Sequence, residues 1–204
     1  MNALLTGLYL VLLITAGRAG SGLRGPRRHP PIATCALFAA VATFSFLQLL
    51  AAPALFTALR RDRAAIADGQ VWRLLTSTVV QDGGWPGTIF NLIALAVLGI
   101  LAERLWGTRH WLALALVVQV LGSLWGLVVQ PVGAGTSLVD FGLAGALATT
   151  AALATRHPLG FVALAAGLAL LLLGDIHGGA ALSGALFAVA AHRIQVRRSQ
   201  AQVK

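Results

Sequence analysis

The chain has 204 residues, of which 58% are hydrophobic and 10% are charged, and its formal net charge is +9. Soluble domains carry about 25% charged residues, so this composition excludes an ordinary water-soluble protein and indicates one that is embedded in lipid. The apolar runs are continuous and do not alternate, which favours transmembrane helices over a membrane β-barrel.

The first apolar run covers residues 2–17 and has no Lys or Arg before it. A secretory signal peptide begins with a basic segment, so we expect this run to be retained as a short extra transmembrane helix. An interfacial helix is the second possibility and a cleaved signal the third. With the loop that follows, residues 1–31 are predicted to form an N-terminal apolar segment and a basic loop.

Six further apolar runs approach the roughly 20 residues that a membrane-spanning helix needs. These runs lie at 33–54, 88–105, 111–130, 138–155, 159–174 and 176–192. They predict a transmembrane core over residues 32–194, followed by a basic tail at 195–204. The connection at 55–87 mixes tryptophans, an arginine and apolar pairs, so we expect it to lie in the membrane interface.

Most basic residues fall in four connections, at 18–29, 103–110, 155–158 and 192–204. The predicted helices place all four on one side of the membrane, and short loops rich in Lys and Arg stay in the cytoplasm. We therefore expect the segment before the core and the C-terminus to be cytoplasmic; the basic stretch at 60–63 is the exception. Charge confined to connections does not indicate nucleic-acid binding.

Two polar residues stand at the starts of apolar helices. Ser137 follows a Gly- and Pro-rich stretch and begins one run, and His177 begins the last run. Each has a structural explanation, because Ser is a common N-cap and polar residues are frequent near helix ends. Together they can form a dyad, since a neighbouring histidine can remove the serine proton and make the hydroxyl nucleophilic. An ionisable residue within a membrane is itself an indication of function.

Small residues recur on one face of each of these two helices. On the last helix the face consists of His177, Ala180, Ala181, Gly184 and Ala188, and on the earlier helix a similar face consists of Ser137, Phe141, Ala144, Ala148 and Ala151. Such faces allow helices to approach closely in lipid. We therefore expect the two faces to meet and to bring Ser137 and His177 within hydrogen-bond reach.

Other polar residues can complete such a site. Backbone N–H groups at 137–138 and the amide of Asn91 can stabilise an oxyanion, although Asn91 can equally make an interhelical hydrogen bond. We interpret Asp140 as an anion at a helix N-terminus in preference to a third member of a triad. Asp175 can cap the last helix. A metal site from Asp140, Asp175 and His177 lacks any recognisable ligand spacing.

Several segments, in their order along the chain, resemble the rhomboid family of intramembrane serine proteases. GQVWRLLT at 69–76 is similar to the Trp-Arg segment of the family's first outer loop. FNLIALAVLGILAERLWG at 90–107 is similar to its second helix, with an Asn, a Gly, a Glu and a final Gly. GTS at 135–137 stands where the family has Gly-x-Ser, and His177 with Gly184 matches the His and Gly of its sixth helix.

The resemblance extends over about residues 33–193 and implies an all-α membrane protein. Its fold would be a six-helix rhomboid-like transmembrane bundle, with the N-terminal run as an extra short apolar helix. The implied activity is cleavage of a transmembrane protein substrate within the lipid bilayer, with no metal, nucleotide or other cofactor and no nucleic-acid partner. The implied location is a bacterial inner or plasma membrane, with a cytoplasmic C-terminus.

The resemblance also assigns roles to residues. By this resemblance, Ser137 would be the nucleophile and His177 the general base and acid. The backbone of Leu138 and the amide of Asn91 would hold the oxyanion. Supporting positions are Phe141, which occupies the place of an aromatic that stacks on the histidine, and Gly135, Gly184 and Asp140.

The chain departs from the family pattern at two positions. Leu138 follows the serine where the family has Gly, and Gly87 stands where the family usually has a His four residues before the Asn. A second register places GLAG at 142–145 on the motif, with Ala144 in place of the serine. We favour the Ser137 register because it puts Phe141 in the stacking position.

These departures keep a second function open, a catalytically inactive rhomboid-like pseudoprotease that binds transmembrane helices. A third possibility is a small transporter or a proton path through Asp140 and His177. The chain shows no paired inverted repeats or broken helices, which makes the third function the weakest.

Overall fold

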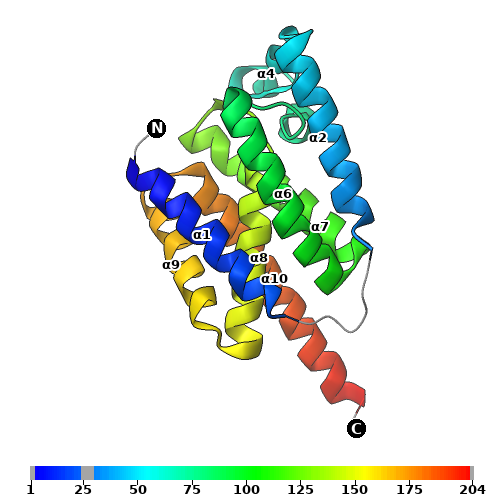
Figure 1. Ribbon diagram of the computed structural model, residues 1–204, viewed down its shortest axis with the longest axis vertical. Helices are drawn as coiled ribbons and strands as arrows, with labels where there is room; N and C mark the ends of the chain where they lie inside the picture. The colour runs from blue at the N-terminus through cyan, green and yellow to red at the C-terminus, as the bar shows by residue number, and fades with distance from the viewer. Residues whose placement is uncertain (1–2, 24–29, 203–204) are drawn as a thin grey trace.

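The computed structural model describes residues 3–23 and 30–202. Long helices dominate this part of the chain and run up and down as a bundle (Figure 1). The long helices are α1 (Ala3–Ser21), α2 (Ile32–Leu50), α6 (Gly84–Trp106), α7 (Thr108–Val129), α8 (Ser137–Thr155), α9 (Pro158–Leu172) and α10 (Ile176–Gln202). The short elements are α3 (Ala54–Leu59), α4 (Arg63–Ala67), α5 (Arg73–Thr76), β1 (Arg61–Asp62) and β2 (Val132–Gly133).

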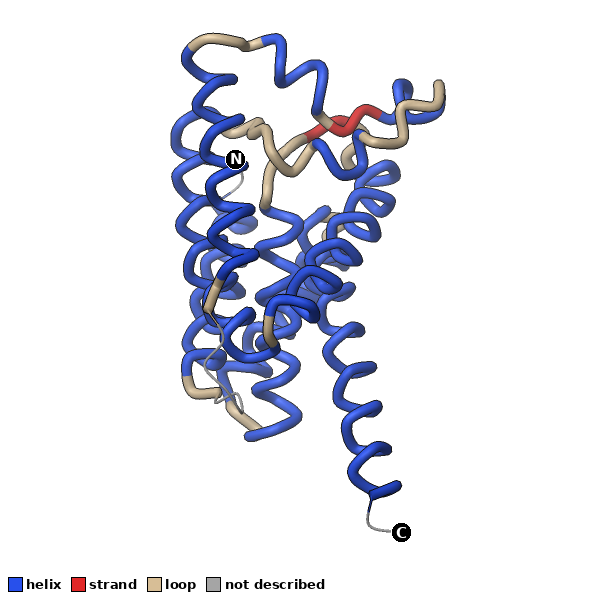
Figure 2. Tube along the Cα trace, turned by 90° about the vertical axis from the view of Figure 1, so that its right-hand side faces the viewer, coloured by secondary structure: helices blue, strands red, loops and turns tan. Residues whose placement is uncertain are grey.

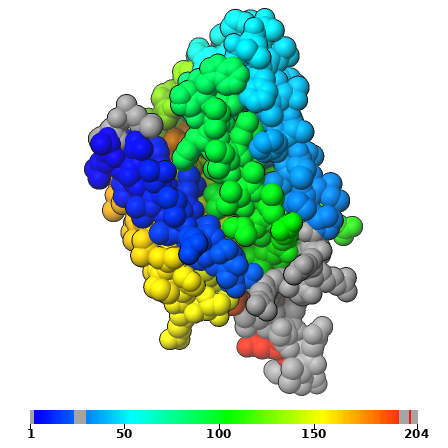
Figure 3. Space-filling view, viewed as in Figure 1, coloured from blue at the N-terminus to red at the C-terminus, as the bar shows by residue number. Residues whose placement is uncertain are grey.

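The chain is an all-α membrane protein. Within the described residues, five helices are long and apolar enough to cross a bilayer, namely α1, α2, α6, α7 and α8. α9 is a shorter apolar helix. The expected N-terminal helix is present, and it extends to Ser21. Helix α1 packs against α8 and α9, and Figure 3 shows it covering the face between α6 and α9.

Helix α8 lies at the centre of the bundle. Its apolar stretch is 78% buried, whereas the other four candidate spans are buried to 39% or less. It contacts α1, α6, α7, α9 and α10. Alanine and glycine make up much of its sequence, so neighbouring helices can approach it from every side. The position of α8, and so of the residue that begins it, is therefore fixed by its contacts with five other helices.

Helices α8 and α10 approach closely through the predicted small-residue face of α10, but on α8 the closest contacts are at Gly142 and Gly145, beside the predicted face. A Cβ atom on Gly184 would overlap the carbonyl oxygen of Gly142, and one on Gly145 would overlap the carbonyl oxygen of Ala181. Only glycine permits such backbone contact. The close approach of the two helices is therefore confirmed, whereas the α8 face predicted for it was wrong, because glycines on a neighbouring face allow the closer backbone contact.

Glu103, near the end of α6, ties α6 to the start of α2. Its Oε1 accepts hydrogen bonds from the Ala33 N–H at 2.9 Å and the Thr108 hydroxyl at 2.7 Å. Its Oε2 accepts from the N–H and the hydroxyl of Thr34, each at 2.7 Å. Side-chain oxygens that accept from the first N–H groups of a helix stabilise its start, so Glu103 caps α2 from another helix.

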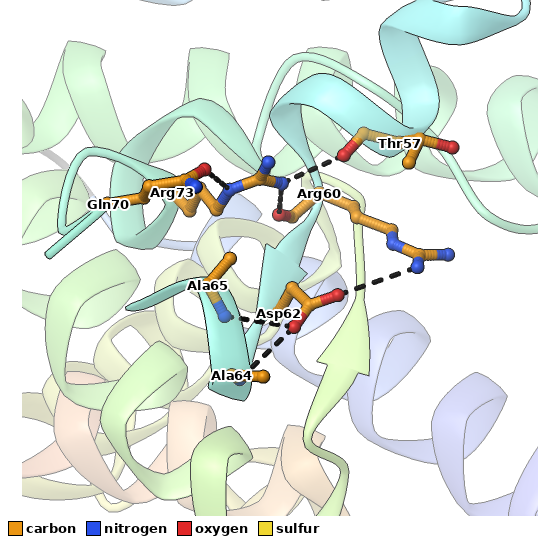
Figure 4. Close-up of polar contacts among 7 residues, drawn as sticks. All are labelled: Thr57, Arg60, Asp62, Ala64, Ala65, Gln70 and Arg73. Atoms are coloured by element: carbon orange, nitrogen blue, oxygen red, sulfur yellow. Dashed lines mark hydrogen bonds and ion pairs between the residues drawn. The ribbon is translucent and has the colours of Figure 1, made fainter. Parts of the chain in front are cut away.

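The connection between α2 and α6 folds into short elements (Figure 4). Arg73 donates to Gln70 Oε1 at 2.7 Å and to the carbonyl oxygens of Thr57 and Arg60 at 2.8 and 3.0 Å. The side chain of Asp62 accepts from the N–H groups of residues 64 and 65 and so caps α4. These bonds keep the loop compact.

Strands β1 and β2 pair antiparallel, with Arg61 opposite Gly133 and Asp62 opposite Val132. This pairing joins the first long connection to the segment before α8. Figure 2 shows the pair at the end of the molecule opposite the C-terminus. The α6–α7 and α8–α9 connections lie at the C-terminal end (Figure 1). Of the predicted basic connections, residues 24–29 lie outside the described residues.

Candidate active site

Ser137 is the first residue of α8, and the segment before it is fixed by the surrounding loops. The Gly135 N–H donates to the Ser77 carbonyl oxygen at 2.8 Å, and the Ala134 N–H donates to Asp82 Oδ2 at 3.2 Å. Gly135 has φ +138°, and a Cβ atom there would lie 3.0 Å from Gln81 Oε1. The motif glycine is thus required both by its backbone conformation and by the lack of space.

The hydroxyl of Ser137 is not used as a helix cap. The N-cap residue of α8 is Thr136, and its side chain makes no capping hydrogen bond. Within the described part of the chain, Ser137 Oγ has no hydrogen bond to a helix N–H. The purely structural explanation for this serine therefore loses its main support.

His177 lies in the first turn of α10 and is held by Asp175. Asp175 Oδ1 accepts from the His177 backbone N–H at 2.9 Å, so Asp175 is the predicted N-cap of this helix. The same oxygen lies 2.8 Å from His177 Nδ1. An ionised carboxylate only accepts hydrogen bonds, so this contact places the proton on Nδ1 and leaves the Nε2 lone pair free.

Two aromatic rings pack against the imidazole. The ring of Phe141 lies 4.5 Å from it between centroids, with the planes at 42°, so the contact expected for Phe141 is present. The ring of Tyr9, from α1, lies 4.7 Å away at 66°. Contact with two rings restricts the rotation of the imidazole.

Ser137 and His177 line one small cavity of about 80 Å³. Its lining is largely polar and comes from the first long connection, the segment before α8, and the starts of α8 and α10; it consists of Arg61, Ser77, Asp82, Gln130, Ala134, Gly135, Ser137, Leu138, Ile176 and His177. Within the described residues, Ser137 Oγ makes no hydrogen bond to the imidazole. Catalytic hydrogen bonds are often long before substrate binds.

Asn91 does not line this cavity among the described residues, but it lies beside it. A Cβ atom on Gly135 would lie 3.2 Å from Asn91 Nδ2 and 3.7 Å from Ser137 Oγ. Asn91 Nδ2 donates to Gln81 Oε1 at 2.6 Å. Gln48 in turn fixes the backbone of Gln81. The Gln81 N–H donates to Gln48 Oε1 at 2.9 Å, and Gln48 Nε2 donates to the Gln81 carbonyl oxygen at 2.8 Å. The sequence analysis missed this glutamine pair.

Arg61 is a second residue that the sequence analysis did not identify as part of the site. Its side chain is buried beside the cavity, and its Nη2 donates to the Gln130 carbonyl oxygen at 2.9 Å. Its Nε has no hydrogen-bond partner among the described residues. Burial lowers the pKa of the Arg61 guanidinium, and the charge of Asp82 opposes that change. A buried arginine within a run of basic residues gives no distinguishing sequence pattern.

Asp140 is fully buried near the start of α8, and its Oδ2 accepts from the Thr136 hydroxyl at 3.3 Å. The carboxylate that contacts the imidazole is that of Asp175, and among the described residues Asp140 makes no hydrogen bond to His177. Ala144, the serine position in the second register, lies further along α8 and does not line the cavity within the described residues. The described residues also contain no group of three or more His, Cys, Asp or Glu side chains placed to hold a metal.

The fold and the site define a polytopic helical membrane protein with a serine and a histidine at the starts of two packed helices. A model of the rhomboid domain matches residues 68–198, which is more than half of the chain. The chain belongs to the rhomboid family. Helices α1 and α2 lie entirely outside the matched region.

A curated relative is similar over a shorter stretch. The chain is 36% identical over 88 residues to the protein named Rhomboid protease GluP from Bacillus subtilis (strain 168). The aligned stretch covers 43% of this chain and 17% of that protein. The similarity therefore concerns a small part of the relative.

Proposed function

We propose that this rhomboid-family protein is an intramembrane serine protease that cleaves transmembrane protein substrates with a Ser137–His177 dyad. The observation that carries the proposal is that Ser137 and His177, 40 positions apart in the sequence, line the same small polar cavity. Phe141 packs on the imidazole, and the serine hydroxyl is not engaged as a helix cap.

In the first step, His177 Nε2 accepts the Ser137 proton while Ser137 Oγ attacks the carbonyl carbon of the scissile peptide bond. The tetrahedral intermediate collapses, the C–N bond breaks, and His177 gives the proton to the leaving amine. Water then attacks the acyl-enzyme with His177 again as the base, which releases the carboxylate product and restores the serine.

The oxyanion is stabilised by the Leu138 backbone N–H at the start of α8 and by the Asn91 amide. Helix N-termini offer unpaired N–H groups, and those of α8 are beside the nucleophile. Asn91 Nδ2 carries two hydrogens, of which Gln81 accepts one. The second hydrogen is therefore available to the oxyanion.

The substrate is a transmembrane segment that unwinds readily. Backbone hydrogen bonds shield a peptide bond within a helix, so the segment must open before Ser137 can attack. A cavity of about 80 Å³ admits a few atoms at a time, which suits an extended strand of substrate and not an intact helix.

The test is cleavage of a model transmembrane substrate in proteoliposomes. Ser137→Ala should abolish cleavage and leave the unfolding temperature unchanged. His177→Ala should also abolish cleavage, with a lower unfolding temperature because the imidazole packs against Phe141 and Tyr9. Ser183→Ala is the matched control, because the Ser183 hydroxyl bonds only within α10, to the Gly179 carbonyl oxygen. Full activity in Ser137→Ala would overturn the proposal.

The pseudoprotease is the alternative outcome. Leu138 follows the serine in place of the family's Gly, and its side chain fills space against α7, close to Gly122. Gly87 offers no side chain toward the oxyanion. A parent protein that binds transmembrane peptides but neither cleaves them nor reacts with serine-directed reagents would establish this alternative.

We also propose that the protein lies in a bacterial inner or plasma membrane, with residues 18–31 and the C-terminus on the cytoplasmic side. Residues 1–31 form the N-terminal segment, residues 32–194 the transmembrane core and residues 195–204 the tail. The placement of Arg residues in short connections supports this orientation. In a Cys35→Ser background, a cysteine at exposed Gln200 should resist impermeant reagents applied outside intact cells. Labelling from outside would contradict this orientation.

A further inference from the structure

The N-terminal helix contributes a side chain to the candidate active site. The Tyr9 hydroxyl donates to Asp175 Oδ2 at 2.6 Å, although the two residues are 166 positions apart. The Tyr9 ring also contacts His177, and it meets Phe141 edge-on, with centroids 5.2 Å apart. A single residue of α1 therefore touches both the imidazole and the carboxylate that holds it.

Asp175 accepts hydrogen bonds on both of its oxygens. Oδ1 takes the backbone N–H and the Nδ1 of His177, and Oδ2 takes the Tyr9 hydroxyl. Partial burial alone would raise the pKa of the Asp175 carboxyl. The hydrogen bonds from His177, together with the Tyr9 hydroxyl, outweigh burial and hold that pKa below its ordinary value. The carboxyl is therefore ionised at neutral pH and acts only as an acceptor.

The backbone of Asp175 is anchored as well. Trp125 of α7 donates through its Nε1 to the Asp175 carbonyl oxygen at 3.3 Å. The side chain of Asp175 is 12% exposed and that of His177 is 16% exposed, so water competes weakly for these contacts. Three helices, α1, α7 and α10, thus fix one carboxylate relative to the imidazole.

We infer that Asp175 and Tyr9 are positioning residues for the general base. Asp175 holds the His177 proton on Nδ1, and Tyr9 holds Asp175 in place and packs against the imidazole. The inference rests on the proposed function, because it concerns how His177 acts on Ser137. It makes α1, which lies outside the matched family domain, part of the catalytic unit.

The chemistry requires this orientation. His177 can accept the Ser137 proton only if Nε2 carries a lone pair, which requires the proton on Nδ1. Without the carboxylate, the imidazole can adopt the other tautomer or rotate out of line. Hydrogen bonds to charged groups are strong enough that losing one should slow the reaction about ten- to a hundredfold.

The test measures the rate at which a small fluorophosphonate labels Ser137 in the full-length protein. This rate reports the reactivity of the dyad without any need for substrate docking. Asp175→Asn and Tyr9→Phe should each slow labelling about ten- to a hundredfold, with Asp175→Asn the slower. Tyr9→Phe keeps the ring, so it isolates the hydroxyl.

Two control variants remove similar groups elsewhere. Thr15→Ala deletes a hydroxyl of α1 that bonds only within its own helix, and Asp68→Asn neutralises an exposed carboxylate in the first long connection. Both should label at the parental rate. Asp175→Glu should recover part of the rate lost in Asp175→Asn, because it restores a carboxylate.

A second readout follows the imidazole directly. In protein with ¹⁵N-labelled histidine, the His177 resonances, assigned by their loss in His177→Gln, should show the Nδ1–H tautomer in the parent. They should show a tautomer mixture in Asp175→Asn. A purely structural role for Asp175 would lower the unfolding temperature without moving these shifts.

The outcomes separate the two proposals. Parental labelling rates in Asp175→Asn and Tyr9→Phe, with Ser137→Ala unlabelled, would overturn the positioning role and leave the dyad intact. An unlabelled parent would instead mean that the proposed function has failed. In that case the tautomer measurement still decides the positioning claim, and an unchanged tautomer in Asp175→Asn would overturn it.

Discussion

Glu103 and Arg61 are buried polar side chains at opposite ends of the bundle, and they differ in how fully their polar atoms are paired. At the end where α6 turns into α7, Glu103 is fully buried and both of its oxygens accept hydrogen bonds, two of them from the N–H groups that begin α2. At the other end, Arg61 lines the Ser137–His177 cavity, and its buried Nε has no hydrogen-bond partner among the described residues.

This difference indicates that the Glu103 cluster stabilises the fold and that the cavity serves a ligand or a reaction. A fully satisfied buried cluster stabilises the fold and offers nothing to a ligand. Buried groups left without partners beside a cavity cost stability, so they are retained where a ligand or a reaction uses them. Substitutions at the Glu103 end should therefore change stability, and substitutions at the cavity end should change activity.

The largest expected effect comes from the dyad. Ser137→Ala and His177→Ala should each lower kcat for a transmembrane substrate at least about a thousandfold, since neither acts without the other. The double variant should be no slower than either single one. If the fall in kcat of the double variant equalled the product of the two single falls, the two residues would act independently.

Asn91→Ala should have the next largest effect. Losing one oxyanion donor costs about 2.7–4 kcal/mol in the transition state, so kcat should fall about a hundred- to a thousandfold. KM should change little, because the oxyanion exists only during the reaction. A rise in KM alone would show that Asn91 serves substrate binding or packing instead.

Glu103→Ala should act on the fold. Removing the carboxylate leaves the N–H groups of Ala33 and Thr34 buried without an acceptor, which should cost about 3 kcal/mol. Glu103→Gln should cost less, since its amide oxygen can still accept. Thermal unfolding in detergent measures both variants, and the labelling rate of the folded protein should be unchanged. A fall in that rate without a fall in stability would break the comparison between the two ends.

The smallest effect is a gain. A Cβ atom on Gly87 would meet nothing within 4 Å, so a larger side chain fits there. Gly87→His should raise kcat a few-fold by adding an oxyanion donor. Gly87→Ala is the control, because it captures only the helix propensity gained by replacing glycine, up to about 1 kcal/mol. Equal rates in the two variants would exclude a role for the new imidazole.

Much of the fold followed from the sequence, because helix-length apolar runs and small-residue faces are local patterns. The face of α10 that approaches α8 was predictable from its small residues at regular spacing, but the sequence did not distinguish Gly142 and Gly145 from the other small residues of α8. The two-residue strands were not predictable, since such short pairing leaves no periodicity. Arg61 gave no distinguishing pattern within its basic run.

The partners of His177 show where sequence reasoning fails. It named the imidazole and Phe141 as neighbours, because both lie at helical spacings from recognisable motifs. It considered Asp140 as a third member, whereas the contacting carboxylate is Asp175, two residues before the histidine. It missed Tyr9, because the contact depends on how α1 packs in the bundle.

The central claim is that Ser137 is an activated nucleophile. Its most direct test is to treat the parent protein with a fluorophosphonate, digest it and locate the adduct by mass spectrometry. The account predicts one adduct, on the peptide that contains Ser137, and its loss in His177→Ala. No adduct in the folded parent, or an adduct on Ser77, which lines the same cavity, would contradict it.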